Sequence, residues 1–132
     1  MSLHRLIYAS RPFGFDAGVL AGILITARAH NARNDITGAL ICRSDIYLQL
    51  LEGPGDAVHA TFDRIKQDDR HVEVKTLHDA PSGERIFGRW AMRHDPFTSW
   101  MWTRQELQDG AVQGASALEA QAIFTRIASQ PD

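Results

Sequence analysis

The apolar positions of the chain fall into five stretches with the pattern of β-strands. Most of them alternate between apolar and polar residues, and the third, which contains Gln49, is apolar on both faces. A strand with two apolar faces is normally central and covered on both sides. Turn residues such as Arg11-Pro12 and Gly53-Pro54 separate the stretches. The expected strands are residues 3–10, 36–42, 46–52, 71–77 and 86–92.

Helical periodicity replaces the strand pattern between the first and second strands and between the third and fourth. The first expected helix starts at an Asp16 cap and runs to about Arg33, with Leu20, Leu24, Ala27 and Asn31 along its buried stripe. The second helix is expected to start at an Asp56 cap and to bury Val58, Phe62 and Ile65.

Two further helices are expected after residue 95. A short one covers residues 100–109 and stops at Gly110. A longer one begins at Ser116, which forms a capping box with Glu119. Its expected inner face consists of Leu118, Ala122, Ile123 and Ile127.

This order of elements, βαββαββ, predicts an α+β protein with a ferredoxin-like fold and a five-stranded mixed sheet. Its two helices cover one face of the sheet, so the two C-terminal helices are expected on the other face. With 132 residues the chain has the size of one domain. We expect a ligand-binding core over residues 1–95 and a helical extension over residues 96–132 that packs on the sheet.

Composition excludes several classes of protein. The net charge is −2 with scattered basic residues, which does not favour binding to nucleic acid or to an anionic membrane. No apolar run is long enough to span a membrane, and the N-terminus lacks the apolar core of a signal peptide, so a cytoplasmic location is expected. The single cysteine, Cys42, rules out an internal disulfide, and the six histidines show no metal-binding spacing.

The candidate chemistry is a set of uncharged polar residues on otherwise apolar faces. A buried amide such as that of Gln49 needs partners, because leaving it unpaired costs about 1–3 kcal/mol. Tyr8 and Asn31 are the other main members, with His30, Trp90 and Met92 as possible ones. Neutral donors and acceptors in an apolar pocket suit a planar heteroaromatic ligand better than hydrolysis. Each residue also has a structural interpretation: Asn31 as a helix C-cap, and the aromatic residues and Met92 as core.

Five segments, in order over about residues 3–94, resemble the BLUF domain, a blue-light receptor that uses flavin. They are Tyr8-Ala9-Ser10, Ala29-His30-Asn31 leading into Ile36-Thr37-Gly38-Ala39-Leu40, Leu48-Gln49-Leu50-Leu51-Glu52-Gly53, Asp68-Asp69-Arg70-His71-Val72-Glu73-Val74, and Phe87-Gly88-Arg89-Trp90-Ala91-Met92.

The resemblance implies a non-covalently bound flavin, usually FAD, between the two N-terminal helices, with FMN or riboflavin as alternatives. It implies that Asn31 bonds the pyrimidine edge of the ring, that Arg70 approaches its carbonyl and phosphate side, and that His30 lies against it. Ile23 and Leu24 are expected to contribute apolar contacts. Gln49 is expected to bridge the flavin and the hydroxyl of Tyr8.

The implied function is that of a photoreceptor and not of an enzyme. Light-driven transfer of an electron and a proton from Tyr8 rearranges the hydrogen bonds of Gln49, and Trp90 and Met92, which are expected to share a strand face, relay the change. The signal then passes to an unidentified partner protein or to a homodimer or higher oligomer. The alternative is a small ferredoxin-like enzyme of the acylphosphatase kind, for which Arg11-Pro12-Phe13-Gly14-Phe15 is a faint phosphate-loop signal.

Overall fold

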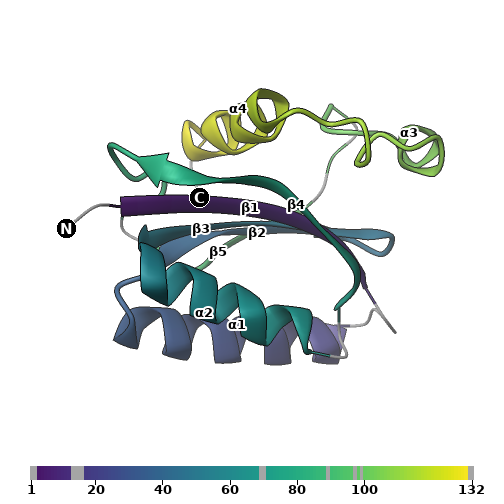
Figure 1. Ribbon diagram of the computed structural model, residues 1–132. Coiled ribbons are helices and arrows are strands. Elements are labelled where there is room, and N and C mark those ends of the chain that lie inside the picture. Colours follow the sequence, from purple (N-terminus) through teal and green to yellow (C-terminus); the bar gives the residue numbers. More distant parts are fainter. Residues whose placement is uncertain are drawn as a thin grey trace.

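A computed structural model describes residues 3–12, 17–68, 71–88, 90–96, 98 and 100–130. Within these ranges the chain forms one sheet with helices on both faces (Figure 1). The elements are β1 (Leu3–Pro12), α1 (Ala17–Arg33), β2 (Thr37–Arg43), β3 (Ile46–Pro54), α2 (Gly55–Lys66), β4 (His71–Ser82), β5 (Arg93–Pro96), α3 (Arg104–Gln108) and α4 (Ala117–Ala128). None of the helices in the described part of the chain is long and apolar enough to cross a membrane.

The five strands are arranged in the order β4-β1-β3-β2-β5. The β2–β5 pair is parallel and the other pairs are antiparallel, so the predicted mixed sheet of a ferredoxin-like α+β fold is confirmed. The strand that carries Gln49, β3, lies at the centre, and its residues from Ile46 to Gly53 are all buried. The apolar character of both its faces is the reason for this position, because only a central strand is covered on both sides.

The two faces of the sheet build two separate cores, since successive side chains of a strand point to opposite sides. Tyr8 joins the core under α1 and α2, whereas its neighbours Ile7 and Ala9 join the core under α4. Figure 1 shows α1 and α2 together on one side of the sheet and α3 and α4 on the other. The C-terminal helices therefore cover the face that the first two helices leave free, as the sequence predicts.

The predicted fifth strand over residues 86–92 is wrong. The strand that pairs with β2 is Arg93–Pro96, and the described residues between Gly83 and Met92 form bends and turns. The backbone N–H groups of Ile86 and Phe87 donate to the carboxylate of Glu52 instead of to a strand, at 2.8 and 3.2 Å. Because the Glu52 side chain already accepts these two hydrogen bonds, the N–H groups do not need the backbone partners of a neighbouring strand.

This irregular segment also separates two residues that the sequence places on one strand face. Trp90 packs against the core under α4, and Met92 is buried in the core under α1 and α2. The predicted shared face of Trp90 and Met92 is therefore wrong. β4, by contrast, is longer than predicted and continues to Ser82 through residues expected to form a loop.

Several details of the helices differ from the prediction. Asp56 lies in the first turn of α2, and the N-cap position belongs to Pro54, which makes no side-chain cap. Ser116 does cap α4, accepting a hydrogen bond from the backbone N–H of Glu119. The short helix starts only at Arg104, after a capping box of Thr103 and Glu106 that the sequence interpretation missed. The expected Asp16 cap lies outside the described residues.

The predicted inner face of α4 is only half right. Ile123 and Ile127 are buried, but Leu118 is 78% exposed and Ala122 is also exposed. The buried face is completed by Ala120 and Phe124, because the helix is rotated by about one residue from the expected phase.

Candidate functional site

The centre of the site is a hydrogen-bonded pair formed by Tyr8 and Gln49. The two residues are direct partners in the antiparallel register of β1 and β3, and both side chains point toward α1 and α2. The Tyr8 hydroxyl donates to Oε1 of Gln49. Tyr8 is 0% and Gln49 3% exposed, so water does not compete for this bond. The predicted proximity of the two residues is confirmed.

The other end of the Gln49 amide contacts Met92. Nε2 of Gln49 donates to Sδ of Met92 at 3.4 Å, so the amide connects a phenol on β1 with a thioether just before β5. A thioether is only a weak acceptor, whereas a carboxamide nitrogen can donate two hydrogen bonds. The residue next to Gln49 is therefore Met92, and Trp90 lies on the opposite side of the sheet.

Asn31 lies in the last turn of α1 and is 1% exposed. Its Nδ2 donates to the backbone oxygen of Ala91 at 2.9 Å, and its own backbone oxygen accepts from Ile36 at 3.0 Å. The side chain thus connects the helix to the segment before β5 and does not cap the helix. Its Oδ1 atom is buried and has no hydrogen-bond partner among the described residues. Because an unpaired buried carbonyl is costly, this atom marks a place where a ligand N–H fits.

A cavity of about 190 Å³ opens between α1, α2 and the sheet, beside Gln49 and Asn31. Polar side chains are the majority of its lining, and four apolar residues supply the rest, so the cavity offers both hydrogen-bonding groups and apolar surface to an organic ligand. The lining residues are Ile23, Thr26, Ala27, His30 and Asn31 from α1, Gln49 and Leu51 from β3, Thr61, Arg64 and Ile65 from α2, and Asp68 and His71 after α2.

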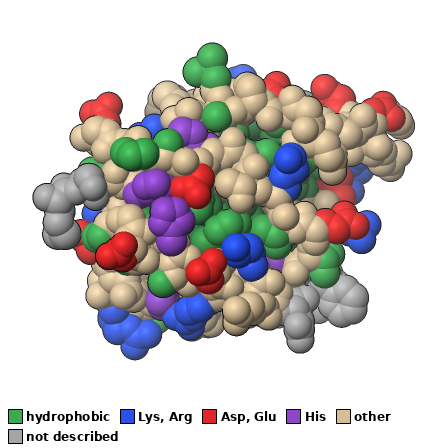
Figure 2. Space-filling view, viewed as in Figure 1, with side chains coloured by type: hydrophobic (Ala, Val, Ile, Leu, Met, Phe, Trp, Pro, Cys, Tyr) green, Lys and Arg blue, Asp and Glu red, His purple; other side chains and the backbone are tan. Residues whose placement is uncertain are grey.

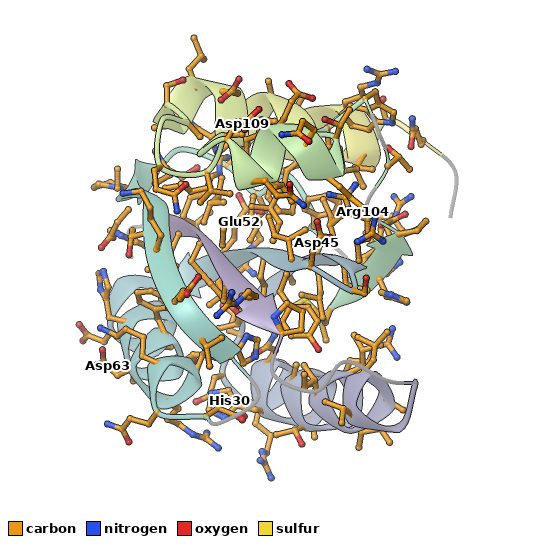
Figure 3. All side chains as sticks on the ribbon, turned by 90° about the vertical axis from the view of Figure 1, so that its right-hand side faces the viewer. His30, Asp45, Glu52, Asp63, Arg104 and Asp109 are labelled. Carbon is orange, nitrogen blue, oxygen red and sulfur yellow. The ribbon has the colours of Figure 1, made fainter. Side chains whose placement is uncertain are left out.

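His30 bridges α1 and α2 across this cavity (Figure 3). The Thr61 hydroxyl donates to the backbone oxygen of Ala57, so His30 Nε2 donates to Thr61 Oγ1, at 2.8 Å. Nδ1 of the ring then accepts from the Arg64 guanidinium at 2.5 Å. Burial, followed by the charges of Arg64 and Arg33, lowers the pKa of His30. The ring is therefore a neutral Nε2–H tautomer at neutral pH.

The electrostatic surroundings also keep Tyr8 protonated. Burial is the main cause that raises the pKa of Tyr8 well above its ordinary value, and Asp68 and Tyr47 raise it further. The ring packs against Phe62 with a centroid distance of 5.2 Å. At neutral pH the phenol is therefore protonated and donates its hydrogen to Gln49.

The only cysteine, Cys42, lies in the same core as Tyr8. Burial raises the pKa of its thiol to about 11, and Sγ lies 3.2 Å from Nε2 of His94. A thiol with so high a pKa is a poor nucleophile at neutral pH, which favours a non-covalent ligand.

The structure brings together most, but not all, of the predicted site residues. Ile23, His30, Asn31 and Gln49 line the cavity, whereas Leu24 is buried in the adjoining core without lining it. Arg70 lies outside the described residues.

Several lining residues were missed by the sequence interpretation. Arg64 was assigned to a solvated helix face, and Thr61 was not singled out, although it lies one turn before the inner residue Ile65 of the same helix. His71 is the first residue of β4, and its Nδ1 atom lies 2.9 Å from the hydroxyl oxygen of Ser10. That pairing across two strands has no signal in the sequence.

The sheet presents a phenol and a bridging carboxamide, and α1 adds an amide oxygen without a partner among the described residues, all beside one cavity. This arrangement suits the binding of a planar heterocycle. The comparison with known families agrees with this class. Residues 3–93 match the model of the BLUF family, described as sensors of blue-light using FAD. The chain belongs to this family and is a flavin-binding blue-light sensor domain.

The similar proteins support the same conclusion. The chain is 43% identical over 74 residues to the photoactivated adenylate cyclase subunit beta of Euglena gracilis, a match that covers 55% of this chain and 9% of that protein. The chain thus spans less than a tenth of this relative. Among solved structures, the photo-activated state of BlsA has a TM-score of 0.82 at 26% identity and covers 98% of this chain and 97% of its own.

The BLUF protein BlrB in its dark state has the same TM-score and identity, with 97% of this chain and 96% of its own covered. The acylphosphatase alternative finds no support in these comparisons.

Proposed function

We propose that this domain senses blue light through FAD held in the cavity, with Tyr8 as the redox partner of the flavin and Gln49 as the switch. One observation carries the proposal: the amide of Gln49 both lines the cavity and accepts the hydrogen bond of the buried, neutral Tyr8. FAD is preferred to FMN or riboflavin because the family description names it.

The residues present fit a flavin. Oδ1 of Asn31 is a buried acceptor without a described partner, which suits the N–H of the pyrimidine edge of the ring. Ile23 supplies apolar surface from α1, with Leu24 in the core behind it, and His30 offers a flat neutral ring at the cavity wall. Arg64 lines the cavity and is a cation that suits the phosphates of FAD, and the sequence resemblance assigns Arg70 to the same task.

When bound, the flavin supplies the absorption of blue light and an excited state that takes up an electron readily. Tyr8 is the electron donor in this proposal, and the loss of an electron makes its hydroxyl strongly acidic. Oε1 of Gln49 is already placed to receive the proton. When the electron and the proton return to Tyr8, the chain has undergone no net oxidation, and Gln49 is left rotated or in its other tautomer.

The changed amide would alter its contact with Met92. If the oxygen of Gln49 faces Met92, no hydrogen remains for Sδ, which cannot donate, and the 3.4 Å bond is lost. Met92 directly precedes β5, so we propose that the change moves the segment from Trp90 to Met92. The ring centroids of Trp90 and Phe87 are 6.2 Å apart in the core under α4. This contact would carry the change to the far face of the sheet.

The recipient of the signal is proposed to be a cytoplasmic partner protein or a second copy of the chain. Relatives such as the photoactivated adenylate cyclases pair light sensing with an activity named for them. In this chain the helical face of α4, connected to the site through Trp90 and Phe87, is the proposed output surface.

The test is an absorption spectrum of the purified chain before and after blue light, with the extracted chromophore identified by mass. We expect FAD and a small reversible red shift. Tyr8→Phe should retain the flavin and lose the shift, because the electron donor is gone. Tyr47→Phe is the matched control, since Tyr47 is equally buried and lies on the same strand face as Gln49, and it should keep the shift.

A colourless protein would refute flavin binding. A normal photocycle in Tyr8→Phe would refute the role of Tyr8 while leaving flavin binding intact.

A further inference from the structure

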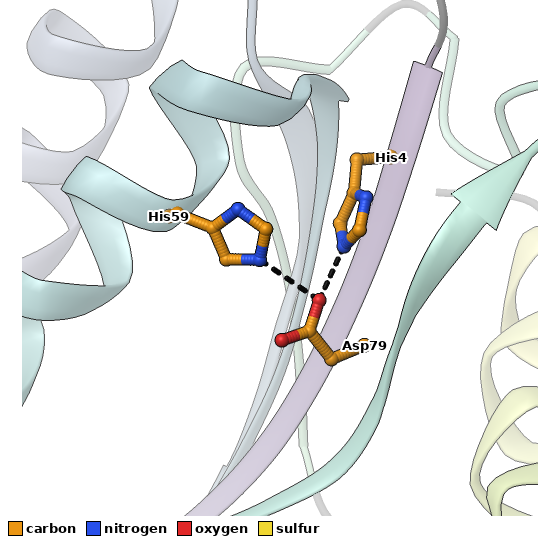
Figure 4. Close-up of side chains that lie close together, drawn as sticks. All are labelled: His4, His59 and Asp79. Atoms are coloured by element: carbon orange, nitrogen blue, oxygen red, sulfur yellow. Dashed lines mark hydrogen bonds and ion pairs between the residues drawn. The ribbon is translucent and has the colours of Figure 1, made fainter.

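Three potential metal ligands that do not line the cavity converge on the surface. His4 on β1, His59 on α2 and Asp79 on β4 direct their side chains to one point (Figure 4). Nε2 of His59 lies 2.9 Å from Oδ1 of Asp79, and Nε2 of His4 bonds the same oxygen. The ligand atoms of all three residues lie within 4.8 Å of one another.

The fold, and not the sequence spacing, creates this cluster. β1 and β4 are neighbours in the sheet, with Leu6 opposite Asp79, and α2 crosses the same face. The ring centroids of His4 and His59 are 4.5 Å apart. Figure 2 shows histidine side chains gathered next to an acidic side chain on the surface of the molecule. Because the three residues come from three elements, a search for ligand spacing on one element could not find them.

We propose that His4, His59 and Asp79 bind a divalent transition metal ion, with Zn²⁺ as the best fit. Two imidazole nitrogens and one carboxylate oxygen suit Zn²⁺, Co²⁺ or Ni²⁺, whereas Mg²⁺ and Ca²⁺ require mainly oxygen ligands. Three protein ligands leave a fourth position for a water molecule.

The geometry needs only a small adjustment to accept the ion. Ligand atoms around tetrahedral Zn²⁺, with bonds of about 2.0–2.1 Å, are roughly 3.3 Å apart. At present 2.9 Å separates His59 Nε2 from Asp79 Oδ1, and all three ligand atoms lie within 4.8 Å of one another. The side chains of His59 and Asp79 are 47% and 40% exposed, so both can rotate outward without disturbing the core. His4 is the more fixed ligand, since its side chain is 15% exposed on β1.

Binding also requires a simple exchange of protons. Each imidazole must present a lone pair at Nε2, so its proton moves to Nδ1, and the ion takes the place of the hydrogens shared with Asp79.

An ion here would fasten α2 to the sheet next to the flavin site. His59 is two residues before Thr61 of the cavity, and His4 is four residues before Tyr8. An ion that binds the folded chain and not the unfolded one raises the stability by mass action. The metal therefore stabilises the packing of the helix that forms one wall of the cavity.

The experiment is a titration of the full chain, freed of any affinity tag, with Zn²⁺ alone, followed by calorimetry and by the melting temperature. We expect one ion per chain and a rise in melting temperature. His59→Asn and Asp79→Asn should each weaken the binding by at least about tenfold, the loss seen when even an outer partner of a metal ligand is removed. His78→Asn is the control, because His78 is the neighbour of Asp79 on β4 but is not part of the cluster.

Co²⁺ gives a readout that needs no variant, since ligation by histidine in a four- or five-coordinate site produces visible absorption beyond the flavin band. The proposal is overturned if this absorption is missing, if Zn²⁺ does not bind, or if His59→Asn and Asp79→Asn bind it as tightly as the unaltered chain. It is also overturned if His78→Asn loses binding to the same extent. None of these results depends on the light response, so the proposal fails or holds separately from the proposed photochemistry.

Discussion

The two buried carboxamides of the site use their hydrogen-bonding capacity to different extents. Gln49 accepts from Tyr8 at one end and donates to Met92 at the other. Asn31 donates to the backbone oxygen of Ala91, but its Oδ1 atom has no partner among the described residues. Gln49 is thus suited to exchange partners within the protein, and Asn31 is suited to hold a ligand.

Replacement of Asn31 by alanine should therefore weaken flavin binding without abolishing the light response. The loss of one buried hydrogen bond of about 1–1.5 kcal/mol corresponds to roughly a tenfold lower affinity. Titration of the apoprotein with FAD, followed by quenching of flavin fluorescence, measures the affinity. Asn34→Ala is the matched control, because the Asn34 amide donates to the backbone oxygen of His30 at 2.7 Å and does not line the cavity. Equal affinities in the two variants would show that Asn31 does not contact the ligand.

For single residues of the site, the sequence reveals those whose side chain is unusual for its surroundings. Gln49 stands out because a polar amide lies within a strand that is apolar on both faces, and Tyr8 follows from the pairing of that strand with the first. Arg64 and Thr61 do not stand out, since a charge and a small hydroxyl are ordinary on a helix. Only the packing of α1 against α2, which joins His30 to both, gives them a role.

Among the elements, the segment between β4 and β5 depends most on one side chain. Glu52 at the end of β3 is 1% exposed and accepts from Arg5 Nε at 2.8 Å as well as from the backbone of Ile86 and Phe87 (Figure 3). The sequence suggests a strand over residues 86–92 because its apolar residues fit one. A propensity pattern cannot reveal that a distant carboxylate binds the first two N–H groups of the segment.

We predict that Glu52→Gln lowers the free energy of unfolding by about 2–3 kcal/mol, since it leaves the partly buried Arg5 guanidinium without its countercharge. Urea denaturation monitored by circular dichroism gives the value. Asp63→Asn is the control, because Asp63 pairs with Lys66 at 3.2 Å on the exposed face of α2, and a surface pair of this kind contributes less than about 1 kcal/mol. A loss in Glu52→Gln no larger than that in the control would mean that the segment is held by its apolar contacts alone.

At the scale of the whole molecule, the predicted layers are correct. The predicted parts, residues 1–95 and 96–132, share one hydrophobic core. Residues 96–132 supply α4, whose buried side chains share one cluster with Ile7, Leu48 and Leu50 of the sheet. We therefore propose that residues 1–95 and 96–132 unfold together. The sequence allows the layers to be predicted because an uncovered apolar sheet face requires a cover. It does not allow the rotation of α4 to be predicted, because Leu118 and Phe124 are both apolar.

A comparison of Phe124→Ala with Leu118→Ala tests this joint core. Phe124 is fully buried and meets Phe87 edge to face at 6.2 Å, so its truncation should cost about 3–5 kcal/mol and lower the melting temperature by roughly 10 °C or more. Leu118 is exposed, so its truncation should change the stability by less than about 0.5 kcal/mol. Thermal unfolding followed both by circular dichroism and by release of the flavin makes the comparison. If α4 belongs to the same cooperative unit as the sheet, the two signals fall together in Phe124→Ala, whereas flavin release at an unchanged temperature would show that the helix unfolds on its own.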